Sequence, residues 1–426
     1  MKLLFIHQGF PGQYIHILRA LDKQGGHQLF GLGLQEPDRP LPASVQYFRY
    51  ALSRGNQPGI HPWVKDMESK AIRGEACARA ANQMKQQGFT PDLICGHAGW
   101  GELLFLKDVW PSVPILTYQE FFYNPQGFDV NFDPEFRDEV NVDDWASAAR
   151  IRMKTANPLL NLEFSSWNVT PTHFQRNSFP KAKRDRISVI HDGIDTKIAC
   201  PSPNPDPVVL GNGIRLTAND QLVTFVNRTL EPYRGCHTLI RAIPELQRLA
   251  PDAQLLIIGK TEGVSYGKAC PQGNWKDFFL AEIDGQYDSS RVHFAGQVPY
   301  DKFLRVLQLS RVHVYLTYPF VLSWSLLEAM SIGCPIVGSA TAPVQEVIEH
   351  QKNGLLVDFF DPNQLALAVG KLLSNREVAK QLGKNARKTI LEQFELQHCV
   401  QRQLDLIHQV ANREVDDEHT GVALQP

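Results

Sequence analysis

The sequence predicts an α/β protein built from two doubly wound domains. Short apolar runs alternate with amphipathic stretches along most of the chain, and this pattern restarts after a proline-rich segment. The length of 426 residues is sufficient for two or three domains. Continuous apolar runs between helices are typical of the strands in a buried parallel sheet.

The first half of the chain carries one series of strands and helices. Ile15, Leu18 and Leu21 recur at helical spacing after the first strand, and a long helix is predicted from about Trp63 to Gln87. The segment Phe121 to Arg150 is rich in Asn, Asp and Phe and predicts an inserted loop. The predicted strands are residues 3–7, 27–34, 92–97, 114–119, 167–172 and 187–193.

A proline-rich segment separates this series from a second one. From Cys200 the chain reads CPSPNPDP, which excludes a helix interior or a central strand and predicts a linker between domains. We expect domains at 1–198 and 199–390, a C-terminal helix at 391–410 and a frayed tail at 411–426, with ligands bound where strands end, in a cleft between the domains. The second series of strands is residues 222–228, 253–260, 291–296, 312–317, 335–340 and 354–359.

Composition excludes several classes of protein. Lys+Arg 43 against Asp+Glu 45 gives a net charge of −2, without the basic stripe of a nucleic-acid binder. No apolar run reaches the roughly 18–20 residues of a membrane span, and the N-terminus lacks the pattern of a secretory signal. The seven cysteines are widely spaced, which predicts reduced thiols and a cytoplasmic protein. Peripheral contact with the inner face of the membrane and a homo-oligomer stay open.

An arginine-containing loop is the sharpest chemical signal. Arg228 and Arg234 follow the strand 222–228, and Gly235 opens a helix. Helix N-termini and guanidinium groups both bind phosphate oxygens, so the loop predicts an anion site. The alternative is that both arginines are solvated surface residues.

A second signal is the segment FVLSWSLLEAMSIGCPIVGS, residues 320–339. Ser325 and Glu328 have the spacing of a capping box, while Gly333 and Pro335 predict the end of a short helix. Glu328 then has two interpretations. Its carboxylate either caps the helix only, or it accepts hydrogen bonds from the ribose hydroxyls of a nucleotide.

These segments together resemble the retaining glycosyltransferases of family four. That family reads G-R-x-x-x-x-K-G, then G-x-G, then E-G-F-G-x-x-x-x-E-A-M-A-x-G-x-P-V. The matching segments here are Asn227-Arg228 with Arg234-Gly235, Gly259-Lys260, residues 320–336, Ile190–Asp195 and Asn353–Val357. Glu120–Phe136 and Ser265–Gly267 resemble a bacterial branch that is generally linked to surface or secreted glycans. The resemblance covers nearly the whole chain.

The resemblance implies the fold called GT-B, in which two Rossmann-like domains face each other across a cleft and a C-terminal helix crosses back to the first domain. It also implies roles for individual residues. Arg228 and Arg234 would hold the donor diphosphate, Glu328 the ribose, and His97 the transferring sugar. The further donor-binding candidates are Gly12, Gly259, Ser323, Trp324 and Ser325, and the acceptor-side candidates are Gly9, Glu120 and Tyr123. His97 and Glu120 also admit a structural interpretation, as a core or cap histidine and a solvated loop carboxylate.

One departure from the family pattern concerns its paired glutamates. The first of the pair falls on Phe320, which cannot accept a hydrogen bond from a sugar hydroxyl. Either Ser323, Trp324 or Ser325 takes the polar role, or the enzyme is weakened. We favour the first interpretation because the arginines, His97 and Glu328 remain.

The predicted reaction moves a sugar, with anomeric retention, from a nucleotide diphosphate sugar to a hydroxyl of a glycan, lipid-linked or protein-linked acceptor. UDP is the favoured nucleotide and GDP an alternative. No cofactor is expected, and no metal, because no Asp-x-Asp motif stands beside the site. A nucleotide-sugar epimerase and a non-enzymatic partner protein are the rival functions. A dinucleotide-dependent oxidoreductase fits poorly, since G-x-G-x-x-G is missing after the first strand.

Overall fold

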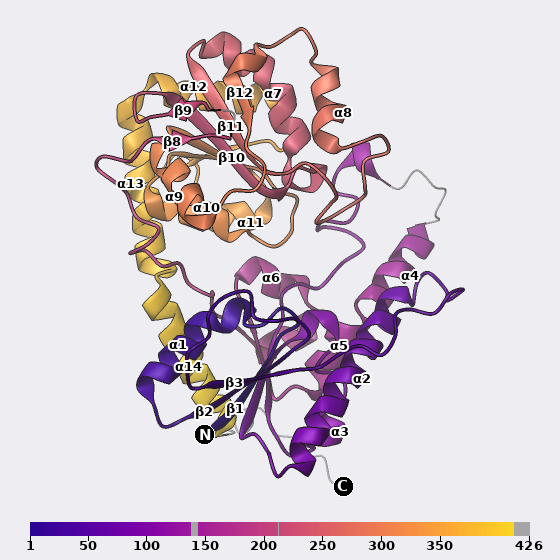
Figure 1. Cartoon of the computed structure of the whole chain (residues 1–426). Coiled ribbons are helices and arrows are strands. Elements are labelled where there is room, and N and C mark those ends of the chain that lie inside the picture. The colour runs from indigo at the N-terminus through magenta and orange to yellow at the C-terminus, as the bar shows by residue number, and fades with distance from the viewer. Residues whose placement is uncertain (138–143, 212, 413–426) are drawn as a thin grey trace. The chain divides into compact units, whose positions relative to one another are not determined.

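The chain divides into two compact units in a computed structural model that describes residues 1–137, 144–211 and 213–412. Unit 1 comprises Met1–Asn131, Asp138–Gly193 and Gln397–Pro426, and unit 2 comprises Phe132–Arg137 and Ile194–Leu396. Each unit contains one parallel sheet packed between helices (Figure 1). The predicted α/β class with two doubly wound sheets is therefore confirmed. The tail predicted at 411–426 lies, from residue 413 on, outside the described residues.

The sheet of unit 1 has seven strands in the order β3-β2-β1-β4-β5-β6-β7, and all of its pairs are parallel. The strands are β1 (Lys2–Ile6), β2 (Gln28–Gly33), β3 (Val45–Arg49), β4 (Leu93–His97), β5 (Ile115–Tyr118), β6 (Trp167–Thr170) and β7 (Ile187–Val189). The helices of the unit are α1 (Ile15–Gln24), α2 (Lys65–Gln86), α3 (Leu106–Val109), α4 (Asp144–Lys154), α5 (Ala156–Phe164), α6 (His173–Ser178) and α14 (Leu396–Ala411). Short 3-10 turns, η1 (Gly12–Tyr14), η2 (Ala98–Trp100) and η4 (Lys181–Arg186), complete it.

The C-terminal helix α14 belongs to unit 1 although α13 (Arg376–Gln393), directly before it, belongs to unit 2. Gln403 donates a hydrogen bond to the carbonyl of His191 at 3.0 Å, and Arg402 donates one to the carbonyl of Val189 at 3.0 Å. The expected return of the last helix to the first domain is therefore confirmed.

Strand β3 is a strand that the sequence analysis missed. Its residues VQYFR are half-buried or exposed, whereas Leu93–His97 of β4 are buried throughout. β3 pairs only with β2 and forms the edge of the sheet. An edge strand lacks the continuous apolar run that marks a central one, which explains the miss.

The sheet of unit 2 has six parallel strands in the order β12-β11-β10-β13-β14-β15. They are β10 (Gln221–Thr229), β11 (Ala253–Lys260), β12 (Val292–Phe294), β13 (Val312–Tyr315), β14 (Ile336–Ser339) and β15 (Leu355–Val357). One core joins the sheet to α7 (Cys236–Leu249), α8 (Trp275–Glu282) and α12 (Pro362–Ser374). A second core contains α9 (Tyr300–Leu309), α10 (Trp324–Ile332) and α13, with α11 (Ala342–Gln345) beside it.

The proline-rich segment lies within unit 2, a few residues after the change of unit between Gly193 and Ile194. It leads into a small antiparallel hairpin of β8 (Val208–Val209) and β9 (Arg215–Leu216). Short 3-10 turns stand at η5 (Pro232–Arg234) and η6 (Ser289–Arg291). Among the residues described in either unit, no helix combines the length and the apolar character that crossing a bilayer requires.

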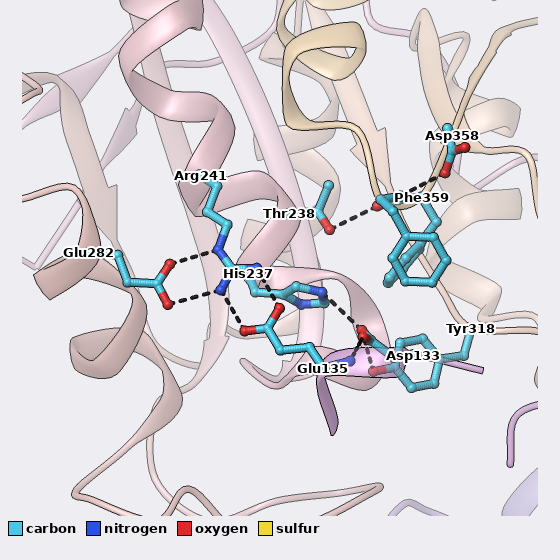
Figure 2. Close-up of polar contacts among 10 residues, drawn as sticks. Asp133, Glu135, His237, Thr238, Arg241, Glu282, Tyr318, Asp358 and Phe359 are labelled. Atoms are coloured by element: carbon cyan, nitrogen blue, oxygen red, sulfur yellow. Dashed lines mark hydrogen bonds and ion pairs between the residues drawn. The ribbon is translucent and has the colours of Figure 1, made fainter. Parts of the chain in front are cut away.

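Residues Phe132–Arg137, which we call the strap, fold with unit 2 although they lie within the inserted segment of the first half. The strap contains η3 (Pro134–Phe136). Asp133 accepts hydrogen bonds from the Tyr318 hydroxyl at 2.8 Å and lies 3.1 Å from Nε2 of His237. Arg241 binds Glu135 at 2.6 Å and Glu282 at 2.7 Å (Figure 2). The inserted segment was predicted to be a loop, but its strap residues are held by hydrogen bonds and ion pairs to other residues of unit 2.

Candidate functional site

Unit 2 contains a pocket of about 380 Å³ where β10 and β11 end. Its walls come from the ends of these two strands, from the loops after them, from residues 297 and 298 after β12, and from the first turns of α9 and α10. Predicted site residues that line it are Arg228, Arg234, Gly259, Ser323, Ser325 and Glu328. The carboxyl ends of parallel strands are the expected place for a ligand in a doubly wound sheet.

Arg234 is a buried cation held at the wall of this pocket. Its Nη1 donates to Thr317 Oγ1 at 2.7 Å and to the Val321 carbonyl at 3.0 Å. Within the described part of the chain, its Nε and Nη2 have no such protein partner. Gly235, with φ of 71°, follows directly, and a Cβ there would lie 2.4 Å from Cβ of Leu316. The loop therefore needs glycine at this position to bring Arg234 to the pocket.

Arg228 supplies a second cation to the pocket and differs from Arg234 in being exposed. It stands in β10, one residue before the strand ends. Two guanidinium groups at one pocket provide several donors in fork geometry, which is the arrangement that binds a diphosphate. The predicted anion site is consistent with this geometry.

Glu328 lies on α10 and faces the same pocket. Its Oε1 accepts a hydrogen bond of 2.6 Å from the hydroxyl of Tyr300. Burial raises the pKa of Glu328 to about 7, and the hydrogen bond from Tyr300 offsets this rise only in part. Hydrogen bonds from the hydroxyl groups of a ligand would stabilise the ionised form of this carboxylate.

The capping box predicted for Ser325 and Glu328 is wrong. The N-cap of α10 is Ser323, whose Oγ accepts from the backbone N–H of Ser325 at 3.3 Å. The Glu328 carboxylate is engaged by Tyr300 and not by the helix terminus. The spacing of a serine and a glutamate matched the motif by chance, because a second serine two residues earlier was the better cap. Gly333, with φ of 86°, ends the helix as predicted.

Phe320 does not line the pocket, although it stands where the family pattern has its first glutamate. Only 4% of it is exposed, and its ring packs against Tyr233 and Tyr266, with centroid separations of 5.2 and 5.1 Å. The guanidinium carbon of Arg234 lies 5.7 Å from the ring centroid. Trp324, exposed at the start of α10, is not part of the pocket wall among the described residues.

Several pocket residues were missed by the sequence analysis, among them Glu231, Tyr266 and Tyr300. Glu231 lies between Arg228 and Arg234 in the sequence, within the loop from which the anion site was predicted. Tyr266 is in the Ser265–Gly267 segment, which the sequence analysis mentioned only for its resemblance to a bacterial branch of the family. Tyr300 begins α9, and no local pattern marks it as a partner of Glu328.

In unit 1, His97 is the last residue of β4 and is 3% exposed. It caps η2, accepting the N–H of Gly99 at Nδ1 over 2.8 Å, and its ring stacks on Trp100 with centroids 4.1 Å apart. Burial, with a smaller contribution from His7, lowers the pKa of His97 well below its ordinary value. The ring is therefore neutral at pH 7, with its proton on Nε2, which can donate.

His7, at the end of β1, is a neighbour of His97 that the prediction did not include. The two ring centroids are 5.6 Å apart, and Nδ1 of His7 donates to the carbonyl of Gly9 at 2.7 Å. Burial lowers the pKa of His7 to about 4. A Cβ on Gly12, whose φ is 53°, would lie 2.5 Å from the His7 ring. Gly12 is thus required for packing against His7, whatever its role toward a donor.

The acceptor-side candidates also lie in unit 1. Glu120 follows β5 and is exposed, with its Oε2 4.0 Å from Nε2 of His97. The ring of Tyr123 lies under the ammonium of Lys154, 3.5 Å from its centroid. Their roles, and those of His97, Gly9 and Gly12, stay predictions.

One group of side chains among the described residues has the composition of a metal site. One ligand atom from each of Asp133, Glu135 and His237 lies within 4.8 Å of the other two. Protein partners already account for these charges, because Arg241 binds both oxygens of Glu135 and His237 contacts Asp133 (Figure 2). We therefore interpret this group as the anchor of the strap.

Two family models match the chain. Residues 25–199 match the model described as "Glycosyl transferase family 4 group", and residues 213–389 match "Glycosyl transferases group 1". Curated relatives include alpha-maltose-1-phosphate synthase of Mycolicibacterium smegmatis, 26% identical over 55% of this chain and 59% of the relative. D-inositol 3-phosphate glycosyltransferase of Corynebacterium efficiens is 24% identical over 48% of this chain and 47% of the relative. The chain spans about half the length of the curated relatives it matches.

Solved structures share the fold over nearly the whole chain. HepE of Anabaena, in complex with UDP and glucose, aligns with a TM-score of 0.64 and 17% identity, covering 96% of this chain and 100% of that one. Sucrose-phosphate synthase of Thermosynechococcus elongatus aligns with a TM-score of 0.70 and 19% identity, covering 96% and 99%. At these identities the similarity establishes the fold alone.

Proposed function

We propose that this chain, which belongs to the glycosyl transferases of family 4 and group 1, transfers a sugar from a nucleotide diphosphate sugar to a hydroxyl of an acceptor. The observation that carries the proposal is the pocket of unit 2, where Arg228 and Arg234 share a wall with Glu328. Two cations suit a diphosphate, and a carboxylate suits a vicinal diol. A nucleotide diphosphate sugar contains both groups.

The proposed chemistry depends on charge that develops on the leaving diphosphate. As the bond from the sugar to the phosphate oxygen breaks, negative charge grows on that oxygen. Arg234 is held in place by its hydrogen bonds to Thr317 and Val321, so it can stabilise this charge without rearranging. A group that is already oriented lowers the barrier more than one that must reorganise.

The finer parts of the proposal rest on the family resemblance. We propose retention of the anomeric configuration, a hexosyl donor, and no required cofactor or metal. A UDP donor is supported by the UDP complex of HepE, with GDP as the alternative. His97 is the proposed ligand of the transferring sugar, because its Nε2–H is available as a neutral donor.

The proposed acceptor is a glycan or a lipid- or protein-linked hydroxyl. The proposed location is the cytoplasm, since none of the seven cysteines, all of which lie in the described residues, is paired in a disulfide.

A thermal-shift screen with UDP-, GDP- and ADP-sugars tests the proposal. A ligand at about 100 times its Kd stabilises the folded state by about 2.7 kcal/mol, which raises the melting temperature measurably. Arg228→Ala should abolish the shift, and its folding should be normal because Arg228 is exposed. Arg234→Ala should abolish it as well.

Arg248→Ala is the matched control, because Arg248 is exposed on α7 and pairs with Glu245 at 2.7 Å, outside the pocket wall. This variant should keep the full shift. Loss of the shift in the control, or its persistence in Arg228→Ala, would contradict the assigned site.

A further inference from the structure

Glu231 holds the loop that follows β11. Its Oε2 accepts the backbone N–H of Ser265 at 2.8 Å, and its Oε1 accepts that of Tyr266 at 3.0 Å. A third bond joins Thr229 Oγ1 to Ser265 Oγ over 2.7 Å. Thr229 and Glu231 therefore hold the loop at two consecutive residues, Ser265 and Tyr266, and we call this set of hydrogen bonds the clasp.

The position of this carboxylate needs an explanation, because Glu231 is 1% exposed. Burial raises the pKa of Glu231, and the two backbone hydrogen bonds oppose the rise. Burying a carboxylate is costly unless hydrogen bonds or an opposite charge compensate for the lost hydration. The carboxylate of Glu231 accepts from backbone N–H groups of a loop whose residues 262–264 are exposed. What Glu231 determines is thus where the loop lies.

The loop places one aromatic ring at the pocket. Tyr266 lines the pocket together with Arg234, whose guanidinium carbon is 5.2 Å from the centroid of the Tyr266 ring. On its other sides the ring meets Tyr233 at 5.6 Å and Phe320 at 5.1 Å. Phe320 therefore supports an aromatic wall at the position where the family pattern carries a glutamate.

We propose that Glu231 is a positioning residue of the donor site and acts through Tyr266, whose ring contacts the donor next to the phosphate that Arg234 binds. The inference rests on the proposed function. Without the clasp, the loop would lose its two backbone anchors and Tyr266 would leave the wall. The pocket would then still offer the two arginines to the donor but would lose the aromatic surface beside them.

A double-mutant cycle on the full chain tests this proposal. Kd for the nucleotide sugar selected by the screen is measured by calorimetry for the wild type, Glu231→Gln, Tyr266→Ala and the double variant. The N–H of Tyr266 also lies 3.1 Å from Oε2, the oxygen that accepts from Ser265. In either orientation of a glutamine amide, its NH2 group replaces one carboxylate oxygen and faces a backbone N–H that this oxygen accepted, that of Ser265 or that of Tyr266, so the loop is repelled at one of its two anchors. We expect Tyr266→Ala to weaken binding about tenfold, as the loss of one aromatic contact and its buried area does. Glu231→Gln should weaken it about fivefold, and the double variant should bind like Tyr266→Ala alone.

Two controls accompany the cycle. Tyr266→Phe keeps the ring and should bind within about twofold of the wild type. Glu262→Gln removes a carboxylate from the same loop, but Glu262 is exposed and outside the pocket wall, so its Kd should not change. Hydrogen exchange in the absence of ligand provides a second readout. The amides of residues 265 and 266 should exchange faster in Glu231→Gln and in the double variant, but not in Tyr266→Ala or Glu262→Gln.

The outcomes separate the two proposals. If the wild type binds the donor and the losses in the cycle add, Glu231 does not act through Tyr266 and the inference is overturned while the proposed function stands. Unchanged exchange at both amides in Glu231→Gln would also overturn it. If the wild type binds no nucleotide sugar at all, the proposed function fails, and the role of the clasp in donor binding fails with it.

Discussion

Donor affinity should rise with pH, because Glu328 must be ionised to accept hydrogen bonds from the ribose. The pKa of this carboxyl in the free protein is raised to about 7 by burial. Bound hydroxyl groups favour the ionised form and lower the pKa in the complex. The nucleotide sugar carries no phosphate group that titrates near neutrality, so the change reports on the protein.

The magnitude follows from the ionised fraction of Glu328. With a pKa of about 7, that fraction is about 0.09 at about pH 6 and about 0.9 at about pH 8. If only the ionised form binds, the apparent Kd falls about tenfold over this interval. At about pH 7 binding should release about half a proton.

Calorimetry in two buffers with different ionisation enthalpies measures both quantities. Glu328→Gln cannot titrate, so its Kd should not vary with pH and should exceed the wild-type value about tenfold or more at about pH 8, where a charge-assisted bond is lost. Tyr300→Phe removes the bond that lowers the pKa of Glu328, so the rise in affinity should move to higher pH. Glu349→Gln, an exposed residue paired with Lys352, is the control. A wild-type Kd that is constant between these pH values, or a Gln variant with the same slope, would refute the reasoning.

Two further predictions concern the stability of unit 2. Burial acts to raise the pKa of Asp133, but the hydrogen bonds from His237, from Tyr318 and from the Glu135 N–H, with the electrostatic attraction of His237, together lower it. The ionised Asp133 carboxylate therefore contributes its full stabilisation above its ordinary pKa of about 4, and this contribution is lost as the pH falls through the lowered pKa. Asp133→Asn should lower the free energy of unfolding, measured with urea, by about 1–3 kcal/mol near neutrality and by less in acid. Equal stability of the two proteins at neutral pH would contradict the anchoring role of the strap. Gly383→Ala should destabilise by about 1–3 kcal/mol, because a Cβ there would lie 2.1 Å from the Gly333 carbonyl oxygen. Gly370→Ala, where the nearest atom is 3.4 Å away, should be neutral or stabilising by up to about 1 kcal/mol, and equal thermal shifts for the two variants would contradict this packing account.

The sheets could be predicted because their central strands are buried on both faces. Such strands appear in the sequence as continuous apolar runs, as in Leu93–His97 and Ala253–Lys260. Edge strand β3 was missed because none of its residues is buried, so it lacks a continuous apolar run. The pattern depends on burial, so its reliability decreases toward the edge of a sheet.

The pocket was only partly predictable for a different reason. Arg228, Arg234 and Glu328 belong to local motifs, and the structure brings all three to one pocket. Contacts between distant segments leave no local pattern, as with Tyr300 and Glu328, 28 residues apart, or Glu231 and Ser265, 34 apart.

The strap illustrates the same limit. Asp133 and Tyr318, 185 residues apart, are joined by a hydrogen bond, yet the sequence around Asp133 indicates only a loop.

The most direct test of the central claim follows the fate of the donor. The nucleotide sugar that binds most tightly is incubated with the protein and a panel of hydroxyl acceptors, and proton NMR records the anomeric signals with time. We predict that nucleoside diphosphate accumulates and that the first glycoside formed has the anomeric configuration of the donor, while Arg228→Ala forms neither. Conversion to a different nucleotide sugar without release of the diphosphate would identify an epimerase and contradict glycosyl transfer. A donor that stays unchanged with every acceptor, despite tight binding, would contradict it as well.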